Sequence, residues 1–334
     1  MNTLVSVIVP NYNHEKFLQH RLDSIFNQTV QDFEVILLDD CSTDKSIAIL
    51  NEYSRHPKVS QYIVNKENSG SPFRQWAKGI ELAKGEYIWI AESDDLCELN
   101  FLEKVLLPLM ENTNVGLAYC QSWSINKSGG KTGSWKEHTN DFKTVQFDSD
   151  FKSNGPDFVN DFLIYKNVIP NASATVFRKS VYKQSGGINY KIRYCGDWFL
   201  WLKILCLSDV SFISESLNYF RRHENSVISK AIIKSRSHKF FLPKNDLVMR
   251  KLFSSWLKTQ SSRLDPIRNK NLLLIKKINI EESLFYILDG KLFMAFLHSI
   301  RYFFLSHESN LLFFPFKRIL VSGSRFTLRV MKHK

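Results

Sequence analysis

Hydrophobic positions in the first 125 residues alternate between short continuous runs and longer stretches with helical spacing. The continuous runs are rich in β-branched and aromatic residues, which is typical of buried strands. They lie at 5–10, 33–40, 59–64, 86–93 and 115–123. The stretches with helical spacing lie between them, at 15–28, 47–53, 72–84 and 98–110. Strands that alternate with helices predict an α/β fold with a mostly parallel sheet and helices on both faces.

Several residues mark the predicted ends of these helices. Ser42 and Thr43 have side chains that cap a helix N-terminus, and they precede the second helix. Pro72 suits the first turn of the third helix, and Gly85 suits its C-terminal stop.

The pattern changes after residue 123. Residues 124–155 are polar and rich in Gly, Ser and Thr, which predicts a loop. Residues 195–207 predict a helix that is apolar almost all round and must therefore be buried. Residues 210–226 predict a strand followed by a basic turn.

The composition favours a globular protein of a reducing compartment. The chain has 334 residues, 44% of them hydrophobic, which suffices for a substantial core. Its five cysteines include no C-x-x-C pair, which argues against a disulfide framework and a zinc ribbon. The sequence does not open like a signal peptide, and no apolar run approaches the roughly 20 residues of a membrane span. We therefore expect a cytoplasmic protein.

Charge is spread unevenly along the chain. Residues 230–334 carry 21 Lys and Arg against 6 Asp and Glu, whereas residues 1–229 carry 24 against 27. The basic C-terminal part therefore indicates an anionic partner. Charge alone would allow a nucleic acid, but no recognition motif supports one, so we expect none.

The fourth predicted strand leads directly into three acidic residues, Glu92, Asp94 and Asp95. Like charges at this spacing repel one another unless a cation or strong donors compensate them. Two interpretations remain open: a solvated acidic turn, or a carboxylate cluster that holds a divalent metal and a phosphorylated ligand. The segments 10–12 (Pro-Asn-Tyr) and 39–40 (Asp-Asp) end two other strands. Because ligands bind beyond the carboxyl ends of parallel strands, this shared edge favours the second interpretation.

Five segments of the chain are similar, in the same order, to family 2 glycosyltransferases with the GT-A fold. They are VSVIVPNYNHEKFLQHRLDSIFNQTVQDFEVILLDDCSTDKS, NKENSG, GIELAKGEYIWIAESDD, GGINYKIRYCGDWFLWLK and YFRRHENSV. The resemblance covers about residues 3–228. It implies a GT-A-like catalytic domain at 1–228 and leaves 229–334 as a helical, basic C-terminal region.

The resemblance implies a nucleotide-sugar donor, most often a UDP-sugar, at the ends of the first two strands. Tyr12 matches the tyrosine that stacks on the base, and Pro10 shapes the same turn. Asp40 matches the acid that accepts a hydrogen bond from the uracil imide, and Arg74 is expected to reach the base or the diphosphate. On the residues alone, Tyr12 could equally be an ordinary loop tyrosine, and Asp39 or Asp40 could cap a helix.

The resemblance assigns Asp94 and Asp95 to a divalent metal, Mn²⁺ or Mg²⁺, and to the ribose and diphosphate of the donor. Both ions favour hard oxygen ligands and often use one or two carboxylates together with substrate phosphates. The family commonly has Asp where this chain has Glu92. The role of Glu92 therefore stays open between the ribose and a metal-bound water.

The resemblance assigns the general base to Asp197, the second acid of the family's ED pair, whose first acid is replaced here by Gly196. The alternative is a helix N-cap, and a helix N-terminus would also keep a basic carboxylate ionised. Arg221, Arg222 and His223 match a basic stretch that meets the leaving diphosphate. A purely structural basic turn is the alternative for these three residues.

Together these residues imply an inverting glycosyltransferase that moves a single sugar from a nucleotide sugar to an acceptor hydroxyl. No Q-x-x-R-W run occurs, which disfavours a processive synthase. The expected setting is bacterial surface polysaccharide synthesis (capsule, O-antigen or lipopolysaccharide), with a glycan or lipid-linked glycan as acceptor. Two alternatives remain. One is an NDP-sugar nucleotidyltransferase, disfavoured because NYNHEKF contains no glycine; the other is a catalytically inactive nucleotide-sugar or glycan-binding module.

The C-terminal segment 300–334 combines aromatic clusters with scattered Lys and Arg. We expect its Phe and Leu to enter the interface of an anionic membrane while its basic groups meet lipid head groups. This would hold the enzyme peripherally on the inner face of the plasma membrane. Helices that only pack on the catalytic domain are the alternative, and they are preferred for most of 230–300.

Overall fold

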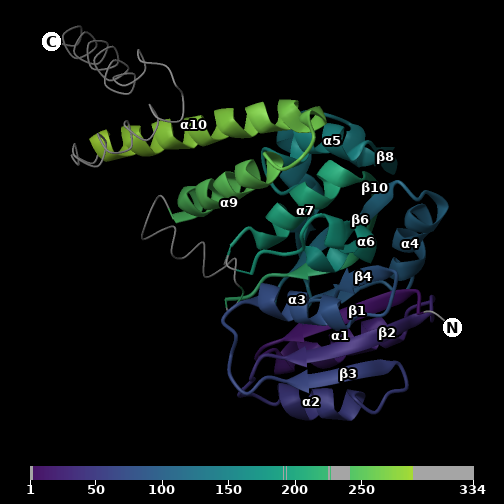
Figure 1. Ribbon diagram of the computed structural model, residues 1–334. Coiled ribbons are helices and arrows are strands. Elements are labelled where there is room, and N and C mark those ends of the chain that lie inside the picture. The colour runs from purple at the N-terminus through teal and green to yellow at the C-terminus, as the bar shows by residue number, and fades with distance from the viewer. Residues whose placement is uncertain (1–2, 191, 193, 225, 227–240, 289–334) are drawn as a thin grey trace, which may run out of the picture. The chain divides into compact units, whose positions relative to one another are not determined.

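The computed structural model describes residues 3–190, 192, 194–224, 226 and 241–288 (Figure 1). The chain forms two compact units, Met1–Ile233 (the first unit) and Lys234–Lys334 (the second unit). The predicted boundary between residues 228 and 229 lies outside the described residues, so it stays a prediction. The predicted membrane segment 300–334 also lies outside them.

One mixed sheet organises the first unit (Figure 1). Its strand order is β3 (Val59–Val64), β2 (Phe33–Asp39), β1 (Val5–Asn11), β4 (Tyr87–Ile90), β9 (Thr175–Arg178), β6 (Val115–Ile125), β10 (Asp209–Arg221) and β5 (Leu96–Cys97). β3, β2, β1 and β4 run parallel, as do β6 and β10. β9 is antiparallel to both of its neighbours and joins the two parallel parts. The predicted α/β fold with a mostly parallel sheet is confirmed.

Helices cover both faces of this sheet. They are α1 (Glu15–Phe26), α2 (Ser46–Tyr53), α3 (Pro72–Leu82), α4 (Phe101–Glu111), α5 (Gly155–Phe158), α6 (Lys179–Gln184) and α7 (Gly196–Leu207). Neighbouring residues of β1 face opposite layers. Val7 belongs to the core cluster with Leu18 of α1 and Phe101 of α4, whereas Ile8 faces α3, where a Cβ on Gly79 would come within 2.4 Å of it. α7 is buried almost all round, as its sequence predicted.

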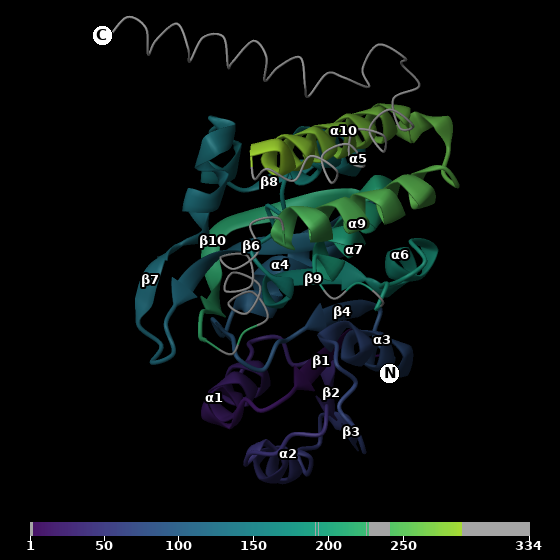
Figure 2. The same ribbon diagram turned by 90° about the vertical axis from the view of Figure 1, so that its left-hand side faces the viewer.

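Residues 124–155, predicted as a loop, contain ordered elements. β6 extends to Ile125 and turns into β7 (Lys131–Ser134), which pairs with it antiparallel (Figure 2). After β7 come 3-10 helices at Trp135–Phe142 and Gln146–Asp148, the strand β8 (Phe151–Ser153), a π turn at Val159–Leu163 and a 3-10 turn at Ala172–Ala174. The loop prediction for 124–155 was wrong because β7, the two 3-10 helices and β8 are short and mostly polar, so the sequence carries no hydrophobic period for them. The last two turns lie beyond that range.

The start of α2 also differs from the prediction. The helix begins at Ser46, and Lys45 occupies its N-cap position without a side-chain hydrogen bond. Ser42 and Thr43 therefore do not cap it. The Ser42 hydroxyl instead donates to Asp39 Oδ2 at 2.7 Å. Asp39, at the end of β2, therefore binds the Ser42 hydroxyl that was predicted to cap α2.

Gly85, predicted as the C-terminal stop of α3, has a different role. α3 ends at Leu82. Gly85 passes so close to β1 that a Cβ on it would lie 2.5 Å from the Ser6 backbone nitrogen. Its N–H donates to the Ser6 hydroxyl at 2.8 Å. Glycine is required here because two backbone segments touch.

The described part of the second unit is helical, as predicted for the C-terminal region. It consists of α9 (Phe241–Leu257), a 3-10 turn at Ser262–Leu264 and α10 (Asp265–Leu288). The buried Asn271 side chain joins the two helices, because it donates to the Arg250 carbonyl at 2.9 Å and to the Ser254 hydroxyl at 2.8 Å. Among the described residues, no helix combines the length and the apolar character needed to cross a membrane.

We expect Gly85→Ala to destabilise the first unit, because the added methyl group would overlap the β1 backbone. Overpacking of this kind costs about 1–3 kcal/mol of unfolding free energy. Urea unfolding followed by tryptophan fluorescence measures the change, since all tryptophans except Trp256 lie in this unit.

Gly133→Ala is the matched control for this variant. A Cβ there would lie 3.7 Å from its nearest neighbour, an ordinary contact, so the unfolding midpoint should stay unchanged. Equal midpoints for Gly85→Ala and the wild type would show that glycine is not required at position 85.

Candidate active site

The buried carboxylate of Asp39 joins the ends of β1 and β2. Asn11 Nδ2 donates to Asp39 Oδ2 at 2.7 Å, and the Ser42 N–H donates to Asp39 Oδ1 at 2.7 Å. These bonds fix the turn after β1. Pro10 is buried within the strand, whereas Tyr12, just beyond it, is 46% exposed. An exposed ring at this edge of the sheet can stack on a planar ligand.

Asp40 follows directly after β2 and is 4% exposed. Its Oδ1 accepts hydrogen bonds from Asn65 Nδ2 (2.7 Å), the Ser69 N–H (2.9 Å) and Gln75 Nε2 (2.8 Å). Its Oδ2 accepts one from the Ser69 hydroxyl at 2.8 Å, so this oxygen retains capacity for a further donor. Neither Asp39 nor Asp40 caps α2, which rules out the helix-cap interpretation for this helix.

Arg74 lies in the first turn of α3 and is exposed. Its guanidinium carbon is 5.0 Å from the ring centre of Tyr190, a cation–π distance. The next residue, Gln75, donates to Asp40. The backbone of Arg74 therefore lies next to a residue that hydrogen-bonds Asp40.

The acidic residues after β4 meet two histidines from distant parts of the chain. Asp94 Oδ2 lies 3.0 Å from His223 Nε2. His14 Nδ1 lies 2.7 Å from the hydroxyl of Ser93. One ligand atom from each of His14, Asp94 and His223 lies within 4.8 Å of the others. Carboxylate oxygen and imidazole nitrogen at this spacing fit a divalent metal.

The sequence analysis missed His14 and assigned His223 only to the diphosphate. His14 follows the Pro-Asn-Tyr segment at the same strand end, in NYNHEKF, and this position was the available signal. The pairing of His14 with His223 joins residues that are far apart in the chain. A single sequence gives no sign of such a pair.

The pKa values of the three acids diverge. Burial favours the neutral form of Asp94, but the attraction of His14 and the hydrogen bond from His223 outweigh burial and lower its pKa. Burial and the charge of Asp94 raise the pKa of Asp95, and burial with the charges of both aspartates raises the pKa of Glu92 to about 8. Asp94 is therefore the most readily ionised member of the cluster and the one best suited to attract a cation.

Asp95 is 2% exposed, so the interpretation of this segment as a solvated acidic turn was wrong. Its Oδ2 accepts hydrogen bonds from Asn171 Nδ2 and the Ser173 hydroxyl, both at 2.6 Å. Its Oδ1 accepts one from the Arg221 N–H at 2.9 Å. Asp95 does not belong to the group formed by His14, Asp94 and His223. Its assignment as a metal ligand stays a prediction.

Two aromatic rings connect Glu92 with Gly196. Trp76 Nε1 donates to Glu92 Oε1 at 2.7 Å. Phe73 packs edge-on against Trp76, with ring centres 5.1 Å apart. A Cβ on Gly196 would lie 2.5 Å from Phe73 Cε2. The ring of Phe73 therefore takes the space that the first acid of an ED pair would need.

Asp197 lies in the first turn of α7, but Cys195, with a left-handed φ of 61°, is the N-cap residue. The N-cap interpretation of Asp197 was therefore wrong. Asn167 Nδ2 donates to Asp197 Oδ2 at 3.0 Å. Burial raises the pKa of Asp197, and hydrogen bonds from the Trp198 N–H and Asn167 oppose part of the rise. A raised pKa brings a carboxylate toward the range in which a general base is efficient.

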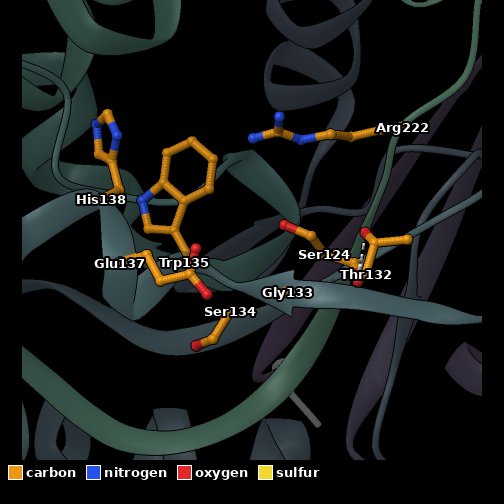
Figure 3. A pocket seen from close by; sticks show the side chains of 8 residues that line it. All are labelled: Ser124, Thr132, Gly133, Ser134, Trp135, Glu137, His138 and Arg222. Atoms are coloured by element: carbon orange, nitrogen blue, oxygen red, sulfur yellow. Dashed lines mark hydrogen bonds between the residues drawn. The ribbon is translucent and has the colours of Figure 1, made fainter.

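The three basic residues predicted to meet the diphosphate occupy different environments. Arg221 is buried, and its Nε donates to the Asp94 carbonyl at 2.7 Å, which is a structural role. His223 joins Asp94, as described above. Arg222 is exposed and extends toward Trp135, with its guanidinium 5.8 Å from the indole ring (Figure 3). This alternation is typical of a strand end, where successive side chains point to opposite sides.

Comparison with known sequences identifies relatives. The sequence profile "Glycosyl transferase family 2" matches residues 6–186. An uncharacterized glycosyltransferase of Haemophilus influenzae is 27% identical over 228 residues, which cover 68% of each chain. Glycosyltransferase GlyG of Streptococcus pneumoniae is 38% identical over 111 residues, or 33% of this chain and 36% of the relative. The poly(ribitol-phosphate) beta-glucosyltransferase of Bacillus spizizenii is 42% identical over 93 residues, but these cover only 15% of that relative and 27% of this chain.

Solved structures share the fold at low sequence identity. Staphylococcus aureus TarS 1-349, in complex with UDP-GlcNAc, is 16% identical with a TM-score of 0.60, covering 91% of this chain and 92% of that one. The mannosyltransferase PcManGT from Pyrobaculum calidifontis, in complex with GDP-Man and Mn²⁺, is 15% identical with a TM-score of 0.56, covering 97% and 80%. These likenesses show the GT-A-like fold. Since the family profile also matches more than half of the sequence, the chain belongs to glycosyl transferase family 2.

Proposed function

We propose that this chain transfers a single sugar from a UDP-sugar to an acceptor hydroxyl, with inversion at the anomeric carbon. The main support is the short segment from Asn167 to Ser173. Asn167 holds Asp197 at one end of the segment, and Asn171 and Ser173 hold Asp95 at the other. The acid proposed as the base and the acidic cluster proposed for the diphosphate are thus fixed to one piece of backbone.

The donor would bind at the ends of β1 and β2. The nucleotide base would stack on Tyr12, in the turn that Pro10 shapes. Its imide N–H would donate a hydrogen bond to Asp40 Oδ2. Arg74 reaches the base or the diphosphate from α3. The structures of TarS with UDP and with UDP-GlcNAc support a UDP-sugar. PcManGT shares the fold but was solved with GDP-Man, so the fold alone does not distinguish uracil from guanine. The choice of a UDP-sugar therefore depends on the hydrogen bond proposed for Asp40.

A divalent metal would be held by His14, Asp94 and His223. Mn²⁺ suits this mixed set of oxygen and nitrogen donors better than Mg²⁺, which prefers oxygen. When bound, the ion supplies positive charge that stabilises the leaving diphosphate. Without the ion, His14 and His223 outweigh burial and lower the pKa of Asp94. Histidines that ligate the ion would be neutral, and the ion itself would then keep Asp94 ionised. Asp95, predicted as a second ligand, is better suited to positioning Asp94, because its own oxygens hold three protein donors.

Asp197 would act as the general base. Asn167 and the backbone at the start of α7 orient its carboxylate by hydrogen bonds, and this carboxylate receives the proton of the acceptor hydroxyl. That hydroxyl attacks the anomeric carbon from the side opposite the diphosphate, and the bond to the diphosphate breaks. A single base suffices for inversion, whereas double-displacement retention needs a second acid as nucleophile. The bond from Trp76 fixes Glu92 for a contact with the ribose.

We further propose a role in surface polysaccharide synthesis on a glycan or lipid-linked glycan acceptor. Similar proteins include the hyaluronan synthase of Pasteurella multocida and a putative teichuronic acid biosynthesis glycosyltransferase of Bacillus subtilis. Peripheral contact with the inner membrane face is proposed for residues 300–334, which combine aromatic and basic side chains. The five cysteines without a C-x-x-C pair favour a cytoplasmic location. Membership of the family disfavours the nucleotidyltransferase alternative, and the environment of Asp197 disfavours an inactive binding module.

Asp197→Asn is expected to lower the turnover of UDP-sugars by about 10²–10⁴-fold, the usual effect of losing a general base. UDP and Mn²⁺ should bind as before. Metal-dependent hydrolysis of UDP-glucose, UDP-galactose and UDP-GlcNAc measures turnover, and calorimetry measures UDP binding. Asp161→Asn, an exposed acid, is the control and should keep full turnover. If Asp197→Asn keeps more than about a tenth of the wild-type rate, Asp197 is not the general base.

The pH dependence of turnover should reflect the raised pKa of Asp197. A base must be deprotonated to act, so kcat/KM should fall as the pH drops through this pKa. The midpoint of the acid limb of the profile should therefore lie above the pKa of an ordinary aspartate, about 3.9. A pH–rate profile of UDP-sugar hydrolysis tests this, and full activity down to pH 4 would contradict it.

Asp94→Asn should weaken Mn²⁺ binding by about 100-fold or more, because it removes the ionised carboxylate of the cluster. Asp95→Asn should reduce the unfolding temperature but weaken Mn²⁺ less, as expected for a positioning residue. Electron paramagnetic resonance of free Mn²⁺ measures both affinities. If the two variants lose Mn²⁺ equally at equal stability, Asp95 is a direct ligand.

A further inference from the structure

A cavity of about 320 Å³ lies outside the residues assigned above to the donor, apart from Arg222. It opens where the β6–β7 hairpin meets the 3-10 helix Trp135–Phe142, and the side chain of Arg222 extends into it from the other side (Figure 3). Sites for small ligands commonly measure about 300–1,000 Å³. The cavity has room for one sugar ring, but little more.

The indole of Trp135 forms the central surface of the cavity (Figure 3). Its position is fixed by His138, 4.5 Å away between ring centres, and by Phe220 at 5.7 Å. Trp135 remains partly exposed despite these contacts. A flat, rigid, partly exposed ring can pack against the C–H face of a pyranose, as aromatic rings do with other apolar surfaces.

Polar groups of both kinds surround this ring. The guanidinium of Arg222 packs over aromatic rings and forms no ion pair with the described part of the chain. The exposed carboxylate of Glu137 likewise has no ion-pair partner among the residues described. Burial and the charge of Lys166 lower the pKa of His138, so its imidazole is neutral at pH 7. One ring nitrogen hydrogen-bonds the Asn167 backbone, which leaves the other nitrogen for a ligand. Donors and acceptors around an apolar face match the hydroxyls of a sugar.

The cavity also connects to both sides of the proposed reaction centre. Arg222 directly precedes His223, which contacts Asp94. On the other side, the imidazole of His138 hydrogen-bonds the backbone of Asn167, whose side chain holds Asp197. The cavity is thus linked to a proposed metal ligand through the chain at residues 222–223 and to the proposed base through His138 and Asn167.

We propose that this cavity is the acceptor subsite and binds a pyranose ring of a saccharide, packed on Trp135 and hydrogen-bonded by Glu137, His138 and Arg222. This rests on the proposed function, because an acceptor presupposes sugar transfer. A hydroxyl of the bound saccharide gives its proton to Asp197 as its oxygen bonds to the anomeric carbon. UDP leaves with the electron pair of the broken bond. Arg222 then serves the acceptor and not the diphosphate to which the sequence assigned it.

The test uses the full chain with Mn²⁺ and UDP, and three probes: the methyl β-glycosides of glucose, galactose and N-acetylglucosamine. Saturation-transfer difference NMR measures their binding. At least one glycoside should bind, and Trp135→Ala should weaken it roughly tenfold or more through the lost stacking. Glu137→Gln should weaken the same glycoside by a smaller factor. UDP affinity, measured by calorimetry, should not change in either variant.

Trp123→Ala is the matched control, since Trp123 is a partly exposed tryptophan of β6 that does not line the cavity. It should bind the glycoside like the wild type. The inference is wrong if no glycoside binds the wild type, if Trp135→Ala and Trp123→Ala bind it equally, or if inorganic phosphate alone displaces it at Arg222. Failure of the wild type to bind UDP would instead overturn the proposed function, so the two failures are distinguishable.

Discussion

The buried carboxylate of Asp95 is the interaction on which the geometry of the site depends. Its two oxygens accept hydrogen bonds from Asn171, Ser173 and the Arg221 N–H. These donors come from the segment before β9 and from the end of β10, whereas Asp95 itself follows β4. A carboxylate removed from water requires such partners, because burial without them costs several kcal/mol. The need to satisfy Asp95 therefore holds three strand ends together.

This arrangement also sets the charges of the cluster. Arg21 is fully buried, with its guanidinium 4.9 Å from the ring of Trp89, and its charge lowers the pKa of Glu92 and Asp95 against the larger effect of burial. Neighbouring acids that compete for one ionised state separate into charged and neutral forms. His14 and His223 outweigh burial and lower the pKa of Asp94, so Asp94 is the acid that ionises most readily. The most acidic carboxyl group of the cluster thus lies where two imidazoles converge.

The sequence predicted β1, β2, β4 and α7 well because these elements are buried at nearly every position and therefore appear as continuous apolar runs. It also indicated the strand ends at Tyr12, Asp40 and Asp94. It did not predict β7 or β8, whose residues are polar and whose partners β6 and β10 are set by tertiary pairing. Nor could it separate Asp94 from Asp95, since adjacent aspartates differ only through donors that lie more than 70 residues away.

The replacement of the first acid of an ED pair by Gly196 has an electrostatic consequence for Asp197. With an acid at 196, the repulsion between adjacent carboxylates would raise the pKa of the base, and salt would screen that effect. Here Phe73 occupies the space at Gly196, and burial is the largest cause of the raised pKa. Desolvation is insensitive to ionic strength. The basicity of Asp197 is therefore set by burial and by its hydrogen bonds to Asn167 and the start of α7.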